Sequence, residues 1–341
     1  LAITGLTVAV TVWLYIVAPK GFLPLQDTGL LTAVLEAHPE ASFVEMRKQQ
    51  AQAAAVISKD TAVTGVVSVI GVSPLNPTPN AGRIAVTLRP VGEREPVETV
   101  IARLRAALTA IPGAVVYMQP VQDVQISTRP SRALYQYTLV GADQAEVIDW
   151  SRRLLAEIAA DPRLSDVASE AQEGGLRAFV NVDRAAAGRL GVSMQAIGDT
   201  LNSAFGQRQI STIYAQSNQY RVVLEADPRY QTDPSALAKI YVPSSSGQQI
   251  PLGAIATVER QTAPLVVQRQ GQFPAVTLSF NIAAGQSLGA AVLAINEATR
   301  RIGMHSSVTG TFTGDTAEFE RALSGQPWLI LAAIITIYIV L

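Results

Sequence analysis

Two uncharged apolar stretches restrict the fold of this chain more than any other feature of its sequence. Residues 1–18 contain no Asp, Glu, Lys or Arg, and residues 327–341 contain none either. At about 1.5 Å per residue, an 18-residue helix approaches the roughly 30 Å of bilayer hydrocarbon. Trp13, Tyr15 and Lys20 lie near the end of the first stretch, where amphipathic rings and a long cationic side chain would meet the lipid headgroups. We therefore expect a membrane helix at each end, in an excerpt of a longer protein. The alternatives for the first stretch are a secretory signal and a buried helix.

The composition argues against several classes of protein. Net charge is −1, with both signs interspersed, so no basic stripe indicates nucleic-acid binding. The absence of cysteine excludes disulfides, thiol catalysis and cysteinyl metal sites from these residues. The only histidines, His38 and His305, belong to no metal-binding motif. We expect no cofactor, no metal and no catalytic residue.

Between the apolar stretches, the hydrophobic period alternates between 2 and 3.6 residues, which is typical of alternating strands and helices. The first block is predicted in the order strand, helix, strand, strand, helix, strand, over residues 30–37, 42–59, 63–72, 83–89, 96–111 and 114–119. The second helix is the clearest, because its apolar residues form one stripe and Pro96 is tolerated in a first turn. A ferredoxin-like sandwich is the natural packing of this order.

A second module of the same kind is interrupted. Its first half is predicted at residues 135–141, 143–160 and 164–170, and its second half at residues 275–282, 287–302 and 307–312. The insert covers about residues 177–264. It is predicted to contain a strand at 178–183, one helix carrying Leu190, Met194, Ile197 and Leu201, and hairpins with arms 209–215 and 219–226, and 240–243 and 249–252. The predicted fold class is α+β: two ferredoxin-like βαββαβ subdomains with an inserted α/β subdomain, flanked by transmembrane helices.

Several strings in the sequence resemble a known family, the resistance-nodulation-division (RND) efflux permeases. GFLPLQDTG at residues 21–29 resembles the stretch that follows their seventh membrane helix. NSAFGQRQISTIY at 202–214 and NQY at 218–220 resemble the MdtB/MdtC branch in particular. The likeness covers essentially the whole chain in order. It implies the second periplasmic loop of a hydrophobe/amphiphile exporter, between membrane helices seven and eight.

The resemblance assigns a role to each part of the chain. Residues 1–18 and 327–341 would be membrane helices. The first pore subdomain, PC1, would be residues 25–122, and the second, PC2, would consist of residues 133–175 and 265–316. The docking subdomain, DC, would be residues 176–264. It implies a proton-driven tripartite multidrug exporter in the inner membrane with most of this segment in the periplasm. The implied partners are amphiphilic drugs or bile acids, a membrane-fusion adaptor, an outer-membrane channel, and related subunits in a homo- or heterotrimer.

The resemblance also assigns residues to the substrate path. The implied substrate-binding positions are Val67, Val72, Pro74, Ala85, Tyr135, Tyr137 and Leu139. The implied switch loop adds Gly71, Ser73, Leu75, Asn76 and Pro77, and the implied docking hairpin is Ser244, Ser245, Ser246, Gly247, Gln248 and Gln249. Phenylalanines of well-known members are replaced by Val67, Val72, Pro74 and Ala85, which implies a narrower or more aliphatic set of ligands. The tyrosine hydroxyls would suit amphiphiles such as bile acids.

Other interpretations stay open at this point. Tyr135 and Tyr137 alternate on a strand, so both could simply pack in a core, and the hairpin tip could be a solvated turn. A membrane-anchored scaffold would use the same modules without a ligand. An esterase-like Gly285-x-Ser287-x-Gly289 precedes Glu297 and His305, but Ser287 also suits a helix cap. Metal export is disfavoured because the methionines are scattered singly, at Met46, Met118, Met194 and Met304.

Overall fold

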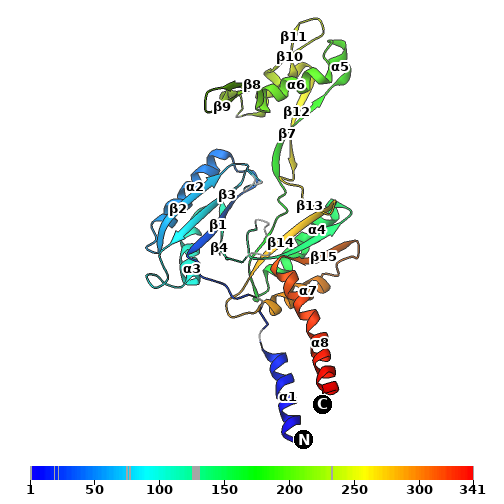
Figure 1. Ribbon diagram of the computed structural model, residues 1–341. Helices are drawn as coiled ribbons and strands as arrows, with labels where there is room; N and C mark the ends of the chain where they lie inside the picture. The colour runs from blue at the N-terminus through cyan, green and yellow to red at the C-terminus, as the bar shows by residue number, and fades with distance from the viewer. Residues whose placement is uncertain are drawn as a thin grey trace. The chain divides into compact units, whose positions relative to one another are not determined.

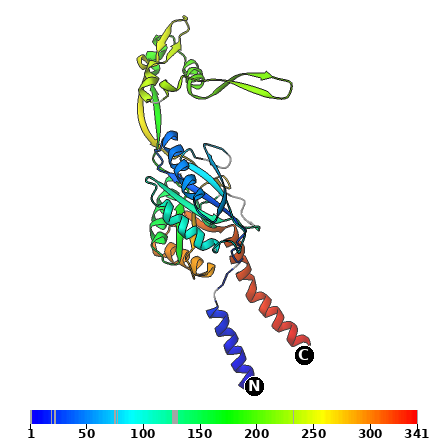
Figure 2. The same cartoon turned by 90° about the vertical axis from the view of Figure 1, so that its left-hand side faces the viewer.

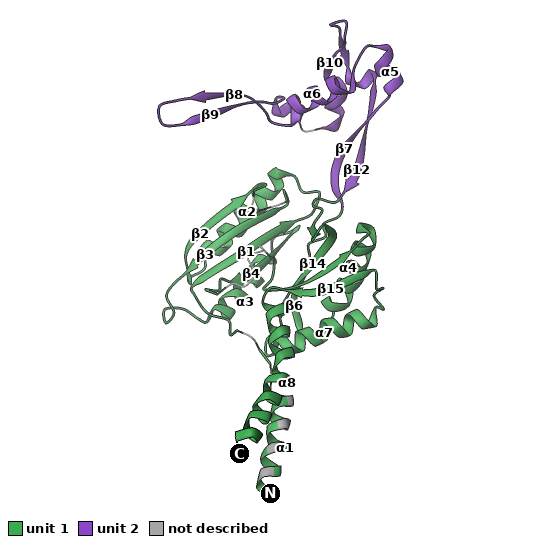
Figure 3. Ribbon diagram, turned by 45° about the vertical axis from the view of Figure 1, so that its right-hand side comes forward, with its two compact units in different colours: residues 1–173, 264–341 green, residues 174–263 purple. Residues whose placement is uncertain are grey.

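The computed structural model of the chain describes residues 2–18, 20–21, 23–73, 76, 78–124, 131–231 and 233–340. The chain divides into two compact units, which Figure 3 colours separately. We call residues 1–173 with 264–341 the body and residues 174–263 the insert. The fold is α+β with antiparallel sheets, which confirms the predicted fold class.

The first half of the body is a ferredoxin-like sandwich (Figure 1). Its elements are β1 (Leu30–Ala37), α2 (Phe43–Ser58), β2 (Val63–Ile70), β3 (Ala81–Leu88), α3 (Val97–Leu108) and β4 (Ala114–Pro120). The antiparallel strands lie in the order β2-β3-β1-β4. Alternate strand residues such as Leu35 and Ile84 are fully buried with Met46 of α2 and Leu104 of α3. Both helices therefore cover one face of the sheet and leave the other without a helix.

The second half of the body repeats this topology from two separated parts of the chain. They are β5 (Tyr135–Gly141), α4 (Gln144–Ala159) and β6 (Leu164–Ser169), and then β14 (Phe273–Ile282), α7 (Leu288–Arg301) and β15 (Val308–Thr313). β14 pairs with both β5 and β6, and β15 pairs with β5, so the strand order is β6-β14-β5-β15. A short strand, β13 (Arg269–Gln270), also pairs with the start of β14. The two parts share one core around Phe280, which confirms the predicted interrupted module.

Two apolar helices of the body, α1 (Ala2–Val17) and α8 (Asp315–Val340), project side by side from its two sandwiches (Figures 1 and 2). The Tyr15 hydroxyl and Gln326 Oε1 are 2.9 Å apart. By length and composition α8 could cross a membrane, and its apolar window is not buried, whereas the apolar part of α1, Gly5–Tyr15, is shorter. α8 begins at Asp315 rather than at 327, because its first turns bury Phe319 against the second sandwich.

The insert is joined to the body by two paired strands, β7 (Gly175–Val182) and β12 (Ala256–Ala263). Between them lie α5 (Arg184–Arg189), α6 (Met194–Phe205), the hairpin β8 (Arg208–Tyr214) with β9 (Gln219–Leu224), and the hairpin β10 (Tyr241–Pro243) with β11 (Gln249–Pro251). Short 3-10 turns lie between the two hairpins at η1 (Pro228–Tyr230) and η2 (Pro234–Lys239), and a third, η3 (Leu252–Ala254), follows β11. Both predicted hairpins are confirmed, whereas β12 was not predicted.

The single helix predicted through Leu190 and Leu201 is wrong. The structure has two helices, since α5 ends before Leu190 and Gly191 adopts a left-handed φ of +69°. Ser193 then caps α6 by accepting a hydrogen bond from the Ala196 amide at 3.1 Å. The apolar spacing continued across this break, so periodicity concealed a turn that glycine and serine determine.

Candidate functional site

The uncovered face of the first sheet carries two of the predicted substrate-binding residues. Strand register places Val67 opposite Ala85, and Ala85 opposite Thr32 of β1. Residues opposite each other in register project from the same face. The Val67 side chain is 64% exposed and Ala85 is also exposed. Val67, Ala85 and Thr32 therefore form a row across the sheet, and this row is an accessible surface of small apolar and hydroxyl groups.

A cation lies in the next row of the same face. Arg83 is opposite Val69 of β2 and Val34 of β1, and Val34 is in turn opposite Tyr117 of β4. Partial burial lowers the pKa of Arg83 from its ordinary value, but a guanidinium stays charged at any physiological pH. Sequence analysis missed this residue, although Arg83 and Ala85 alternate on one strand and must share a face. The face thus combines aliphatic side chains with a positive charge.

The described part of the predicted switch loop is held by its own backbone. Gly71 has φ +98°, a conformation that favours glycine. Ser73 and Asn76 exchange backbone hydrogen bonds of 2.9 and 3.0 Å, and the buried Asn76 amide donates to the Val69 carbonyl at 3.3 Å. Val72 is 70% exposed beside them. The predicted positions Pro74, Leu75 and Pro77 lie outside the described residues.

The predicted residues on β5 divide between the core and a pocket. Tyr137 and Leu139 are buried in the second sandwich, and the Tyr137 ring lies 4.7 Å from the Phe312 ring. Core packing, the alternative raised for Tyr135 and Tyr137, therefore describes Tyr137 in this structure. Leu139 is buried in the same core, so neither Tyr137 nor Leu139 lies on an accessible surface. Tyr135 stacks on Phe280 with ring centroids 5.8 Å apart and is only partly buried.

Tyr135 lines a pocket beside the first residues of α8. The lining residues are Leu23, Pro24, Leu25, Gln26, Gln122, Val124, Leu134, Tyr135 and Asp315, around about 540 Å³ of space that includes the open mouth. Burial raises the pKa of Tyr135, and the nearby Asp315 charge raises it further, so the hydroxyl stays a neutral donor. Apolar walls with a hydroxyl and a carboxylate could hold an amphiphile.

The tip of the β10–β11 hairpin combines one structural serine with exposed residues. Ser244 is buried, and its hydroxyl lies 2.9 Å from that of Ser246 and accepts from the Gln248 amide at 3.2 Å. The Ser245 amide donates to the Gly191 carbonyl at 2.8 Å, which ties the tip to the turn between α5 and α6. The side chains from Ser245 to Gln249 are exposed in the single chain.

The sequence profile described as the AcrB/AcrD/AcrF family matches residues 1–341, which is the whole chain. The chain belongs to the AcrB/AcrD/AcrF family. Its fold is similar to two crystal forms of a heavy metal efflux pump. The TM-scores are 0.81 and 0.83 at 19% and 20% sequence identity, and 98% of this chain is covered in both. The chain spans 35% and 36% of those pump chains, so it corresponds to about a third of their length.

The esterase-like residues do not assemble in this member of the AcrB/AcrD/AcrF family. The Ser287 hydroxyl caps α7 by accepting from the Ala290 amide at 3.3 Å. Glu297 pairs with Arg163 at 2.7 Å, and His305 Nδ1 lies 2.9 Å from the Ser307 hydroxyl. Each of the three candidate groups has a different partner, so no nucleophile, base and acid are connected.

Methionine sulfur is also dispersed in the described structure of this family member. Met46 and Met118 are buried in the first core, Met304 packs against the second core, and Met194 is 45% exposed in the insert. Among the described residues, no group of three or more His, Cys, Asp or Glu side chains could hold a metal ion.

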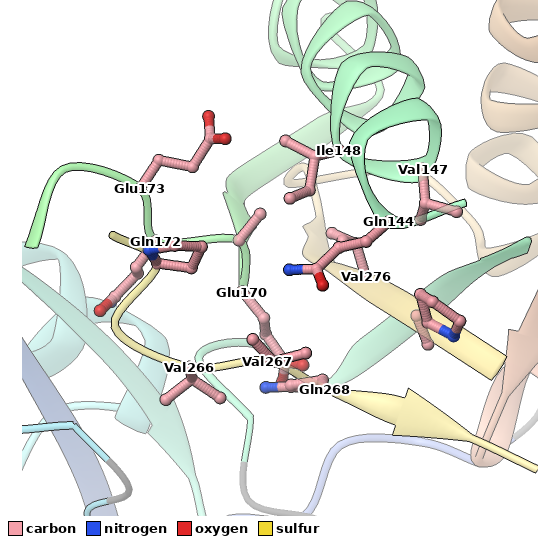
Figure 4. A pocket seen from close by; sticks show the side chains of 14 residues that line it. Gln144, Val147, Ile148, Glu170, Gln172, Glu173, Val266, Val267, Gln268 and Val276 are labelled. Carbon is pink, nitrogen blue, oxygen red and sulfur yellow. The ribbon is translucent and has the colours of Figure 1, made fainter. Parts of the chain in front are cut away.

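A separate apolar pocket lies where the chain leaves the second sandwich for the insert and returns from it (Figure 4). Figure 4 shows Gln144 and Ile148 projecting from α4 toward the segment that carries Glu170. Val266, Val267 and Val276 also line the pocket. None of the predicted substrate-binding residues lines it, so we do not include it in the candidate site.

Proposed function

We propose that this chain is the substrate-conducting periplasmic portion of a proton-driven RND efflux permease of the MdtB/MdtC type. The family membership supports a permease, and the uncovered sheet face with Val67, Ala85 and Arg83 is the observation that carries the proposal. A sheet normally buries one face against helices, so an open face with exposed apolar side chains is suited to a ligand or a partner.

The composition of this face favours anionic amphiphiles, and bile acids are our proposed substrates. Val67 and Val69 offer aliphatic contact to a rigid apolar body, and both are exposed. Arg83 follows in the row of Val69, and its partly buried guanidinium gives this end of the face a positive charge, which favours anionic over cationic amphiphiles. The pocket at Tyr135 offers apolar side chains and a hydroxyl, but its Asp315 carboxylate would repel a bile-acid carboxylate, so only the uncharged part of such a ligand would lie there.

The remaining parts of the chain are assigned by the same proposal. α1 and α8 would be membrane helices of an inner-membrane protein, and the Ser245–Gln249 tip of the insert would meet an outer-membrane channel or an adaptor. Related subunits would complete a homo- or heterotrimer. The alternative is a membrane-anchored scaffold that uses these surfaces for assembly alone.

The test places a larger side chain on the open face of the intact permease and measures bile-salt efflux in cells that lack other exporters. We expect Val67→Trp to reduce bile-salt efflux about tenfold, which corresponds to about 1.4 kcal/mol of lost substrate stabilisation. Val91→Trp is the matched control, because Val91 is 71% exposed in the turn after β3 and lies away from the face. Unchanged efflux in Val67→Trp at equal expression, with activity abolished by deletion of residues 244–249, would favour the scaffold.

A further inference from the structure

The pocket in Figure 4 forms where the sheet of the second sandwich loses one of its strands. β6 ends opposite Leu278, so the residues of β14 that precede Leu278 have no partner in β6. α4 still lies over this part of β14, because Val147 of α4 and Val276 of β14 are buried in the same core. A space therefore remains between α4, β14 and the two segments 170–173 and 264–268, which line it.

The lining of this pocket is mostly aliphatic, and its size suits a small molecule. Its branched aliphatic residues are Val147, Ile148, Val266, Val267 and Val276. The space amounts to about 390 Å³, including the open mouth. Small-molecule sites span roughly 300–1,000 Å³, so this pocket lies near the lower end of the range and suits a single ring better than a steroid skeleton.

One buried oxygen in the lining has no hydrogen-bond donor. Gln268 Oε1 is buried and has no partner in the described part of the chain. The Gln268 carbonyl accepts from the Ala275 amide at 3.0 Å, which holds this residue against the start of β14. A buried acceptor without a donor is unfavourable. A ligand that brings an O–H or N–H group to Gln268 Oε1 would therefore be stabilised in the pocket.

The charges around the pocket disfavour anionic ligands. Glu170 and Glu173 line it, and none of the described lining residues is basic. Arg152 lies outside the lining and pairs with Glu173 at 2.6 Å, and Glu170 also has an interaction partner. Neither carboxylate therefore requires a cationic ligand, whereas both would repel an anion. Neutral molecules fit this charge distribution best.

We propose that this pocket is a second ligand site, which binds neutral one-ring molecules that carry a hydroxyl or N–H donor. Phenol is the simplest member of this class. Its ring would contact the aliphatic side chains of α4 and β14, and its hydroxyl would donate to Gln268 Oε1. A ligand in this position touches α4 and both segments that connect the body to the insert.

Ligand-observed fluorine NMR on the intact permease in detergent tests the chemical class. 4-Fluorophenol supplies the ring and the donor, 4-fluoroanisole has the same ring and oxygen without the donor, and 4-fluorobenzoate carries a negative charge. We expect saturable binding of 4-fluorophenol with a Kd of about 1 mM, binding of 4-fluoroanisole about fivefold to tenfold weaker, and no saturable binding of 4-fluorobenzoate. Absence of saturable 4-fluorophenol binding would mean that water alone satisfies Gln268 Oε1, and the proposal would be wrong.

Substitutions in α4 locate the bound ligand. Figure 4 shows the Gln144 side chain projecting from α4 into the pocket, so Gln144→Phe should fill the space and abolish saturable binding. Ala145→Phe is the matched control, because Ala145 is the next residue of α4, is exposed and does not line the pocket. We expect this control to bind 4-fluorophenol as the parent does. Equal binding by the two variants would place the ligand elsewhere on the protein or in the detergent and would overturn the proposal.

A third variant tests the hydrogen bond. Gln268→Leu removes the acceptor and keeps a side chain of similar size. It should weaken 4-fluorophenol binding about fivefold to tenfold and leave 4-fluoroanisole binding unchanged. An equal loss for both ligands would contradict donation to Gln268 Oε1.

This inference goes beyond the proposed function and does not depend on it. Val67 lies on β2 of the first sandwich and does not line the pocket, so Val67→Trp should leave 4-fluorophenol binding unchanged. Loss of 4-fluorophenol binding in Val67→Trp would move the ligand to the open face and refute the second site. Unchanged bile-salt efflux in Val67→Trp would reject the proposed function alone, because the fluorine measurement needs no transport.

Discussion

A methyl group added at Gly310 would collide with the Tyr137 ring, so Gly310→Ala tests whether that ring is fixed in the core. The new Cβ would lie 2.0 Å from the Tyr137 hydroxyl oxygen and 2.4 Å from its ring Cζ, far inside ordinary contact. The ring is 4% exposed and packs on Phe312, so it has little room to move aside. Overpacking of this kind costs about 1–3 kcal/mol.

A double-mutant cycle separates this collision from other effects. Tyr137→Ala alone should cost roughly 3–5 kcal/mol, as other aromatic truncations in cores do. In that background the Gly310→Ala methyl would enter vacated space, so the double variant should be no less stable than Tyr137→Ala. The expected coupling is then of the order of the overpacking cost, about 1–3 kcal/mol.

Hydrogen exchange in the intact protein is the appropriate measurement, because a chain with two compact units seldom unfolds in one reversible step. The amides of β5 and β15 should lose protection by about 30-fold for a 2 kcal/mol destabilisation. Gly65→Ala is the control, since its Cβ would meet only Thr87 atoms at 3.7 Å. If Gly310→Ala costs the same with and without the tyrosine ring, Tyr137 does not occupy the space, and its ligand role returns to consideration.

Two further predictions concern capping and charge pairing. Hydrogen bonds from Arg94, whose side chain is 2% exposed, hold the pKa of Asp27 below its ordinary value. Folded Asp27 therefore contributes stability above its unfolded pKa of about 3.9, and this contribution is lost as the pH falls through the lower folded value. Asp27→Asn should cost roughly 1–3 kcal/mol at pH 7 and flatten acid denaturation below about pH 4; an unchanged acid profile would contradict this. Ser193→Ala should weaken α6 by about 0.5–2 kcal/mol in hydrogen exchange through loss of its cap, whereas Ser203→Ala, within the helix, should not.

The arrangement of the sandwiches was predictable because it depends on local periodicity and chain order. Strands repeat every 2 residues and helices every 3.6, and the order strand, helix, strand, strand, helix, strand has few compact packings. Phe280 and Leu139 fell on predicted strands and are buried in the shared core. The same reasoning failed at Gly191, where a left-handed residue ended one helix although the apolar spacing continued.

The site was less predictable than the fold. Periodicity predicts which face of a strand a side chain lies on, but it does not predict how deeply that side chain is buried. Tyr135 and Tyr137 share a face of β5, yet one lines a pocket and the other lies beneath Gly310. Resemblance supplied Val67 and Ala85. Strand alternation could have added Arg83 to the same face, but only the register placed it between Val69 and Val34.

The sequence by itself determined the elements of the two sandwiches, their order and the family, since these follow from local patterns and short strings of residues, whereas in the insert it missed β12 and the break between α5 and α6. Only the tertiary structure decided which charges meet. Glu36 and Gln172 are 136 positions apart, and Arg105 and Asp166 are 61 apart. No pattern in the sequence pairs them, because their approach depends on how two separately packed cores dock against each other.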